Sequence, residues 1–176
     1  MRALALVLGV CFCGCAAASG ALFQAIDDHR ERAALDIVAS GKAMLEARNP
    51  KGDTPLHRAV ETGLRELTKA LLDAGADPGA RTRNGETALH LAALHSAPEF
   101  ADLLLAAGAE PGARNADGDS PLHWAALSGH IVVVQRLLAR GADPRGRNRK
   151  GLTAADYARR DGHDEVVRLL ERSGAH

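Results

Sequence analysis

Histidine is the residue type with the greatest chemical potential in this chain of 176 residues, which contains eight of them. His57, His90 and His123 form a column in which each follows the last by 33 residues. Neutral imidazole is a common metal ligand, so such a column raises the question of a metal site. Because the same interval separates the copies of a repeated motif, we interpret the column as structural. A lone histidine such as His95 is a weak metal candidate, and neither a metal nor another cofactor is expected.

Motifs for other kinds of chemistry are absent from the sequence. It has no nucleophile elbow, phosphate-binding loop, His-Glu zinc motif or carboxylate pair at a useful spacing. Asp27 and Asp28 are interpreted as solvated residues. We therefore expect no enzymatic activity. Lys+Arg and Asp+Glu both number 22, so no field of one sign would attract nucleic acid, and nucleic acid is not an expected partner.

The first 18 residues have the three parts of a secretory signal peptide. Arg2 precedes an apolar run over residues 3–12, and small residues follow at 16–18. The run is shorter than the roughly 20 residues that cross a bilayer as a helix. We therefore expect residues 1–18 to be cleaved as a leader and the mature domain, 19–176, to contain no transmembrane helix.

Two processing routes stay open for this leader. The three alanines at 16–18 suit cleavage before Ser19. Alternatively, Phe12-Cys13-Gly14-Cys15 resembles a bacterial lipoprotein box, in which cleavage leaves Cys15 lipidated and provides an anchor to the membrane. All three cysteines lie within this leader region, so the domain after Ala16 has no disulfide chemistry. Both routes predict export, to the periplasm or outer membrane or, as an alternative, to the extracellular medium.

An internal repeat of 33 residues organises the rest of the chain. The motif G-D-T-P-L-H and its variants begin at Gly52, Gly85, Gly118 and Gly151. A second motif, G-A-D-P or G-A-E-P, begins at Gly75, Gly108 and Gly141. The predicted repeats cover about 21–51, 52–84, 85–117, 118–150 and 151–176.

Each repeat contains the signals for two short helices. A helix N-cap, Thr or Ser, precedes an apolar stripe such as Leu56, Ala59 and Val60. The N-caps are Thr54, Thr87, Ser120 and Thr153. Glycine, which tolerates a left-handed conformation, ends the first helix in three repeats, whereas Ser96 replaces it in one and predicts a less relaxed turn. The second helix closes at the glycine of the second motif.

The period, the T-P-L-H motif and the G-A-D-P motif together resemble the ankyrin repeat from about residue 21 to the end. The resemblance implies an all-α solenoid of about five helix-turn-helix units with β-turn finger loops, the first and last units acting as caps. Polar residues at Arg159 and Glu171 are typical of a terminal unit. The resemblance also implies that each motif histidine hydrogen-bonds around its own Thr or Ser and the adjoining backbone. These structural residues are Thr54, His57, Thr87, His90, Ser120 and His123.

A column of arginines accompanies the fingers, at Arg48, Arg81, Arg114 and Arg147. The resemblance implies that they bond within and between fingers. A basic ladder for an acidic partner is the alternative, strengthened locally by Arg145, Arg149 and Lys150.

The binding face is predicted from the residues two and five places after the motif Leu, which leave the apolar stripe. Charged residues occupy three of the four positions in the outer repeats, with Tyr157 as the exception, and apolar residues occupy all four in the middle repeats. We therefore predict a face centred on Leu94, Trp124 and Leu127. The full set of candidates is Leu91, Leu94, His95, Trp124 and Leu127, with Glu61 and Arg160 as rim residues and Arg83, Glu86, Asp117 and Arg149 on fingers.

A repeat stack of this kind works by surface recognition. The predicted function is therefore that of a monomeric protein–protein interaction module that binds, holds or inhibits a partner in the cell envelope. A secreted effector acting on host proteins and a structural envelope scaffold are the alternatives, and the sequence does not name the partner.

Overall fold

A computed structural model describes residues 20–41 and 45–174, and within them the regular structure is α-helical. A helical segment covers 20–27. The named helices are α2 (Glu31–Ala39), α3 (Pro55–Glu61), α4 (Arg65–Asp73), α5 (Ala88–Leu94), α6 (Pro98–Ala106), α7 (Pro121–Leu127), α8 (Ile131–Ala139), α9 (Ala154–Arg160) and α10 (Asp164–Ser173). The predicted leader, with Cys15 and Ser19, lies outside the described residues. None of the described helices is long and apolar enough to cross a membrane.

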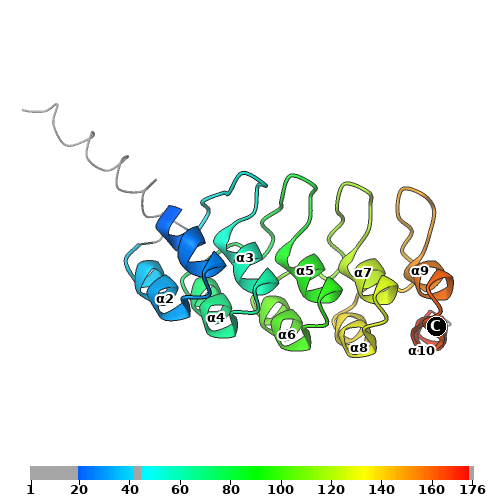
Figure 1. Cartoon of the computed structure of the whole chain (residues 1–176). Coiled ribbons are helices and arrows are strands. Elements are labelled where there is room, and N and C mark those ends of the chain that lie inside the picture. Colours follow the sequence, from blue (N-terminus) through cyan, green and yellow to red (C-terminus); the bar gives the residue numbers. More distant parts are fainter. Residues whose placement is uncertain (1–19, 42–44, 175–176) are drawn as a thin grey trace, which may run out of the picture. The chain divides into compact units, whose positions relative to one another are not determined.

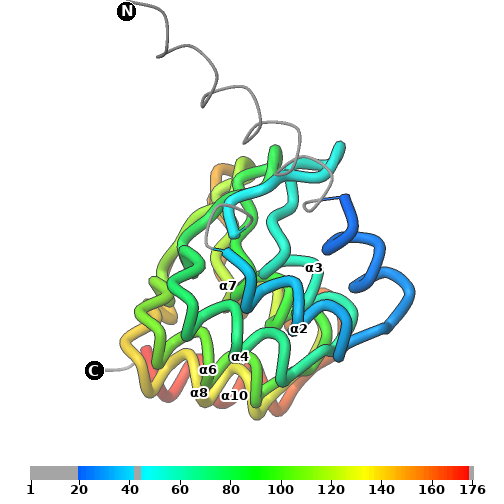
Figure 2. Tube along the Cα trace, turned by 90° about the vertical axis from the view of Figure 1, so that its left-hand side faces the viewer, coloured from blue at the N-terminus to red at the C-terminus, as the bar shows by residue number. Residues whose placement is uncertain are grey.

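The chain divides into two compact units, Met1–Asp77 and Pro78–His176. In the first unit α4 packs against both α2 and α3. In the second unit α5, α7 and α9 form one row of helices, and α6, α8 and α10 form a second row (Figure 1). A view turned by 90° shows the second row, α6, α8 and α10, along one edge of this unit, with the loops at the opposite edge (Figure 2). This arrangement is an all-α repeat solenoid, as predicted.

The helices are too short to be stable alone, so packing must hold them. Helices of seven to ten residues fall below the length at which isolated helices form in water. Each first-row helix begins after a Thr or Ser cap, and α5 and α7 bury their motif leucines, Leu89 and Leu122, with 0% exposure. Leu104 and Leu137 of the second row are equally buried. The predicted apolar stripes therefore form one continuous core within the second unit.

The turn after α3, α5, α7 and α9 requires a left-handed residue. Gly63, Gly129 and Gly162 adopt φ values of 75°, 72° and 78° at this position. Ser96 occupies the corresponding position after α5 with φ 54°, although a side chain makes this conformation costly. The turn at Ser96 is therefore left-handed without a glycine, and its strain stays a prediction.

Loops that we call fingers connect consecutive repeats: the first (45–54), second (78–87), third (107–120) and fourth (140–153). Each finger closes with a backbone hydrogen bond, such as Asn115 N to Asp119 O at 2.9 Å. Adjacent fingers are also joined, because Ala116 N donates to Asn84 O at 2.8 Å and Arg149 N donates to Asp117 O at 3.0 Å. The fingers of the second unit are therefore a connected layer of backbone.

The arginine column satisfies carbonyl groups of this layer. Arg114 Nη1 donates to Gly118 O of its own finger at 2.7 Å and to Arg147 O of the next finger at 3.1 Å. Arg81 makes the equivalent pair of bonds, to Gly85 O and Arg114 O. The column thus bonds within and between fingers, as the resemblance implied.

We predict that Ser96→Gly will stabilise the protein by roughly 0.5 to 1 kcal/mol, because glycine relieves the left-handed strain after α5. Ser128→Gly is the matched control. Ser128 lies at the end of α7 with φ −89°, a conformation that serine adopts without strain. Glycine there only raises the conformational entropy of the unfolded chain, so Ser128→Gly should destabilise the folded protein. Urea melts of the two variants decide the question, and equal effects would show that Ser96 carries no strain.

Candidate functional site

The surface that could bind a partner is built on the histidine column, which holds the start of α3, α5 and α7. Thr87 N donates to His90 Nδ1 at 3.1 Å, and Thr87 Oγ1 lies 2.9 Å from the same nitrogen. His57 with Thr54, and His123 with Ser120, form the same capping box. In each case the histidine takes the place of the Glu or Gln that usually completes this motif.

The second ring nitrogen reaches the next repeat. His90 Nε2 lies 3.0 Å from the carbonyl oxygen of Asp119, and His123 Nε2 lies 3.2 Å from that of Leu152. A carbonyl oxygen only accepts, so Nε2 carries the proton and Nδ1 is the acceptor, which is the neutral form of the ring. Burial lowers the pKa of His90 to about 4 and lowers that of His123. Each ring therefore stays neutral at physiological pH and bonds two repeats together.

Aromatic rings of the following repeat cover these histidines. The Trp124 ring meets the His90 ring edge to face, with centroids 5.4 Å apart, and the Tyr157 ring meets the His123 ring in the same way at 5.8 Å. The position two places after the motif Leu is therefore partly framework, which limits what Trp124 can offer to a partner.

All four apolar candidates are half-buried: Leu91, Leu94, Trp124 and Leu127. Leu94 and Leu127 end α5 and α7 at equivalent positions. Their carbonyl oxygens accept hydrogen bonds from His130 Nε2 at 2.9 Å and His163 Nε2 at 3.0 Å. The histidine after each helix-ending turn thus fixes the backbone of the leucine in the preceding repeat. We call Leu94, Trp124 and Leu127 the apolar face.

The charged candidates differ in exposure. Arg83, Asp117 and Arg149 are exposed on fingers and Glu86 is half-buried. Arg160 is exposed at the end of α9, where it pairs with Asp161 at 3.0 Å and lies 5.2 Å from the centre of the Tyr157 ring.

Glu61 belongs to the first unit, where it is part of an ion cluster. Arg58 bonds to both Glu61 and Asp27, and these charges raise the Arg58 pKa although burial alone would lower it. Asp27 and Asp28 are both exposed, as predicted, and each also takes part in an ion pair, Asp28 with Arg30 at 2.8 Å. Asp28 and Arg30 are two residues apart in the sequence, and Arg58, the partner of Asp27, comes from another repeat. Sequence spacing alone therefore does not reveal these ion pairs.

The comparisons with known proteins agree with this geometry. The family profile described as "Ankyrin repeats (3 copies)" matches residues 16–115 and 97–176. The chain belongs to the ankyrin-repeat family. Ankyrin repeats are protein–protein interaction modules, and this is the function that membership shows.

Two mouse proteins illustrate how local the similarity to curated ankyrin proteins is. The B-cell lymphoma 3 protein homolog of Mus musculus is 50% identical over 46 residues, which are 26% of this chain and 10% of that protein. Rabankyrin-5 of Mus musculus is 48% identical over 52 residues, 30% of this chain and 4% of that protein. The matches span a tenth or less of these relatives' lengths. They therefore show similarity in the repeat and indicate nothing about the activity of the whole relative.

One polar network of the ankyrin fold was not anticipated from the sequence. Asn148 Nδ2 donates to Asp119 Oδ1 at 2.7 Å and to the Tyr157 hydroxyl at 3.1 Å, and that hydroxyl donates to Asp119 at 3.3 Å. Burial and the charge of Asp119 raise the Tyr157 pKa. The network joins the third finger to the fourth finger and α9. Only the interval of 29 residues from Asp119 to Asn148, close to one repeat, was available as a signal.

The described histidines outside the column, His29, His95, His130 and His163, do not gather into a metal site. Within residues 20–41 and 45–174, no group of three or more His, Cys, Asp or Glu side chains is arranged to hold an ion. His95 is exposed at the end of α5. His29, which the sequence argument overlooked, is also exposed. His95 therefore stays a candidate for partner contact only.

We predict that His90→Ala will lower the free energy of unfolding at neutral pH by on the order of 1 to 3 kcal/mol, because buried Thr87 and Asp119 groups lose their partner. The folded-state pKa of His90 lies below its ordinary value of 6.5. As pH falls from about 6.5 to about 4, wild type therefore loses the stability that the neutral ring contributes. The difference in the free energy of unfolding between wild type and His90→Ala should become smaller across that range.

Denaturant melts of both proteins at several pH values measure that advantage. His95→Ala, at an exposed site, is the control and should match wild type throughout. If the difference in the free energy of unfolding between wild type and His90→Ala stays constant or grows as pH falls, the interpretation of His90 as a buried neutral ring is wrong.

Proposed function

We propose that this ankyrin-repeat protein is exported and binds a partner protein in the cell envelope through the apolar face of its second unit. The observation that carries the proposal is the pair of equivalent, half-buried leucines at the ends of α5 and α7. Solvent alone gives no reason for leucine at both sites, whereas an apolar centre among charged residues is how binding hot spots are built.

The backbone under these leucines supports the proposal. His130 and His163 hold the Leu94 and Leu127 carbonyls, so the ends of α5 and α7 are fixed before a partner arrives. A surface that is already ordered loses little entropy on binding. Covering each half-buried leucine would contribute roughly 1 kcal/mol from the apolar area that remains exposed. The partner is therefore expected to present apolar side chains, and the protein to act as a monomeric holder or inhibitor.

The sequence supports the envelope as the location. Arg2, the apolar run at 3–12 and the small residues at 16–18 have the order of a cleaved leader. A lipid on Cys15 would retain the ankyrin domain at a membrane, and cleavage before Ser19 would release it.

We predict that the double substitution Leu94→Glu, Leu127→Glu will abolish partner capture while the domain stays folded. Both side chains are half-buried, so a loss of about 1 kcal/mol each is expected in thermal or urea melts. The measurement is capture of partners by the full chain from its own host, quantified by mass spectrometry. Val132→Glu, Gln135→Glu is the matched control, because it places two carboxylates on the exposed side of α8.

The capture experiment distinguishes three outcomes. Loss of capture in the first variant alone supports the apolar face. Unfolding of that variant would place the leucines in the core, and undiminished capture would move the interface to the fingers or the second row of helices.

We also predict that the protein isolated from its host lacks the leader. Intact-mass measurement should find an N-terminus at Ser19 or at a lipidated Cys15. Cys15→Ser should remove the lipid mass in the second case and change nothing in the first. A full-length chain in the cytoplasm would overturn the proposed export.

A further inference from the structure

The fourth finger, 140–153, carries a concentration of positive charge that the apolar face does not explain. It contains five basic residues and one acidic residue: Arg140, Arg145, Arg147, Arg149, Lys150 and Asp143. The third finger, 107–120, has one basic and three acidic residues: Arg114, Glu110, Asp117 and Asp119. The chain as a whole has no net charge, so this separation is local.

The basic side chains of the fourth finger are exposed and have no acidic partner. All five basic residues are exposed, and none takes part in an ion pair within residues 20–41 and 45–174. Asp143 is occupied by the backbone of the same finger, since its carboxylate accepts from Arg145 N at 2.9 Å. Like charges on one loop repel one another, and a partner carboxylate would relieve that repulsion.

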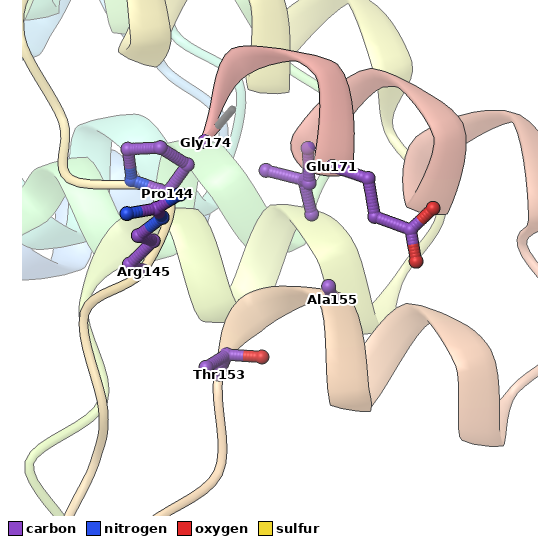
Figure 3. A pocket seen from close by; sticks show the side chains of 7 residues that line it. Pro144, Arg145, Thr153, Ala155, Glu171 and Gly174 are labelled. Atoms are coloured by element: carbon purple, nitrogen blue, oxygen red, sulfur yellow. The ribbon is translucent and has the colours of Figure 1, made fainter. Parts of the chain in front are cut away.

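The third finger contributes one further cation to the surroundings of the fourth, beside the buried carboxylate of Asp119, which accepts from the Asn148 side chain. The Arg114 guanidinium of the third finger bonds to Arg147 O and lies against Gly146. On the other side, Arg145 lines a cleft of about 340 Å³ shared with Glu171 of α10 (Figure 3). The Glu171 carboxylate points away from Arg145 and pairs with Arg159 at 2.9 Å. Glu171 is therefore paired with Arg159 and not with Arg145.

The backbone of the fourth finger is held rigidly in place. Arg149 N donates to Asp117 O at 3.0 Å, Lys150 N donates to the Asn148 side chain at 2.9 Å, and Arg147 Nη1 donates to Gly151 O at 2.6 Å. The exposed ends of Arg149 and Lys150 thus extend from a fixed loop. A preformed array of cations of this kind favours specific recognition of a charged partner.

We propose that the fourth finger is a second binding surface, which takes a short acidic segment of a protein. The extent of the positive charge decides the kind of partner. Glu110 and Asp117 are exposed on the neighbouring finger, and Asp117 adjoins Arg149. A nucleic acid or an anionic membrane would extend over these carboxylates and be repelled, whereas a few consecutive Asp or Glu residues fit the width of one finger.

This inference goes beyond the apolar face, because it rests on neither Leu94 nor Leu127. The proposals for the apolar face and for the fourth finger can therefore be tested independently. The probe for the fourth finger is a fluorescein-labelled peptide of glutamates, and its binding to the full chain is measured by fluorescence anisotropy.

We expect the glutamate peptide to bind wild type and to lose affinity as salt rises from about 50 to about 200 mM. Arg149→Glu, Lys150→Glu should weaken binding at least roughly tenfold, because two attractions become repulsions. Arg149→Gln, Lys150→Gln, which only removes the charges, should give a smaller loss. Arg65→Glu, Lys69→Glu on exposed sites of α4 changes net charge equally and should stay within about twofold of wild type.

Two results would overturn the inference. One is equal weakening by the finger variant and the α4 control, which would make net charge the cause. The other is tighter binding of phosphatidylglycerol vesicles or duplex DNA than of the peptide, through the same residues. Leu94→Ala, Leu127→Ala should bind the peptide like wild type, so failure of the apolar face would not be mistaken for failure here.

Discussion

The structure of the second unit depends on one interaction, the pair of hydrogen bonds made by a buried neutral histidine. His90 accepts from the N-cap of its own helix and donates to the carbonyl of Asp119 in the next finger. Both groups are buried and would otherwise lack partners, which is costly in a packed interior. Because one rigid ring serves both, the start of each helix and the position of the next finger are set together.

The last repeat shows what changes where that link is not made. Asp156 stands in the histidine position, and its carboxylate accepts from the Thr153 backbone N–H and hydroxyl at 2.8 Å each. These bonds lower the Asp156 pKa. Asp156 caps its own helix and pairs with Arg159 at 3.0 Å. The polar residues expected at Arg159 and Glu171 form exposed ion pairs on the outer surface of this repeat.

Stacking also explains why the candidate surfaces are rigid. Arg114 ties the third and fourth fingers through carbonyl groups, while His130 and His163 tie the ends of the first-row helices. Both kinds of bond join neighbouring repeats, so the side chains between them are carried by a fixed backbone. The second unit can in this way present two different chemistries, apolar on α5 and α7 and basic on the fourth finger.

The helices and turns of this protein could be predicted from the sequence because their causes are local: a Thr or Ser cap, an apolar stripe at helical spacing, and a glycine or Ser96 at a left-handed turn. The family resemblance added the role of the histidine column. Contacts between repeats could not be predicted in this way. Examples are the hydrogen-bond network of Asp119, Asn148 and Tyr157 and the packing of the Trp124 ring on His90. Those partners lie about one repeat apart in the chain and meet only after stacking, so tertiary packing alone decided which side chains became framework and which stayed available to a partner.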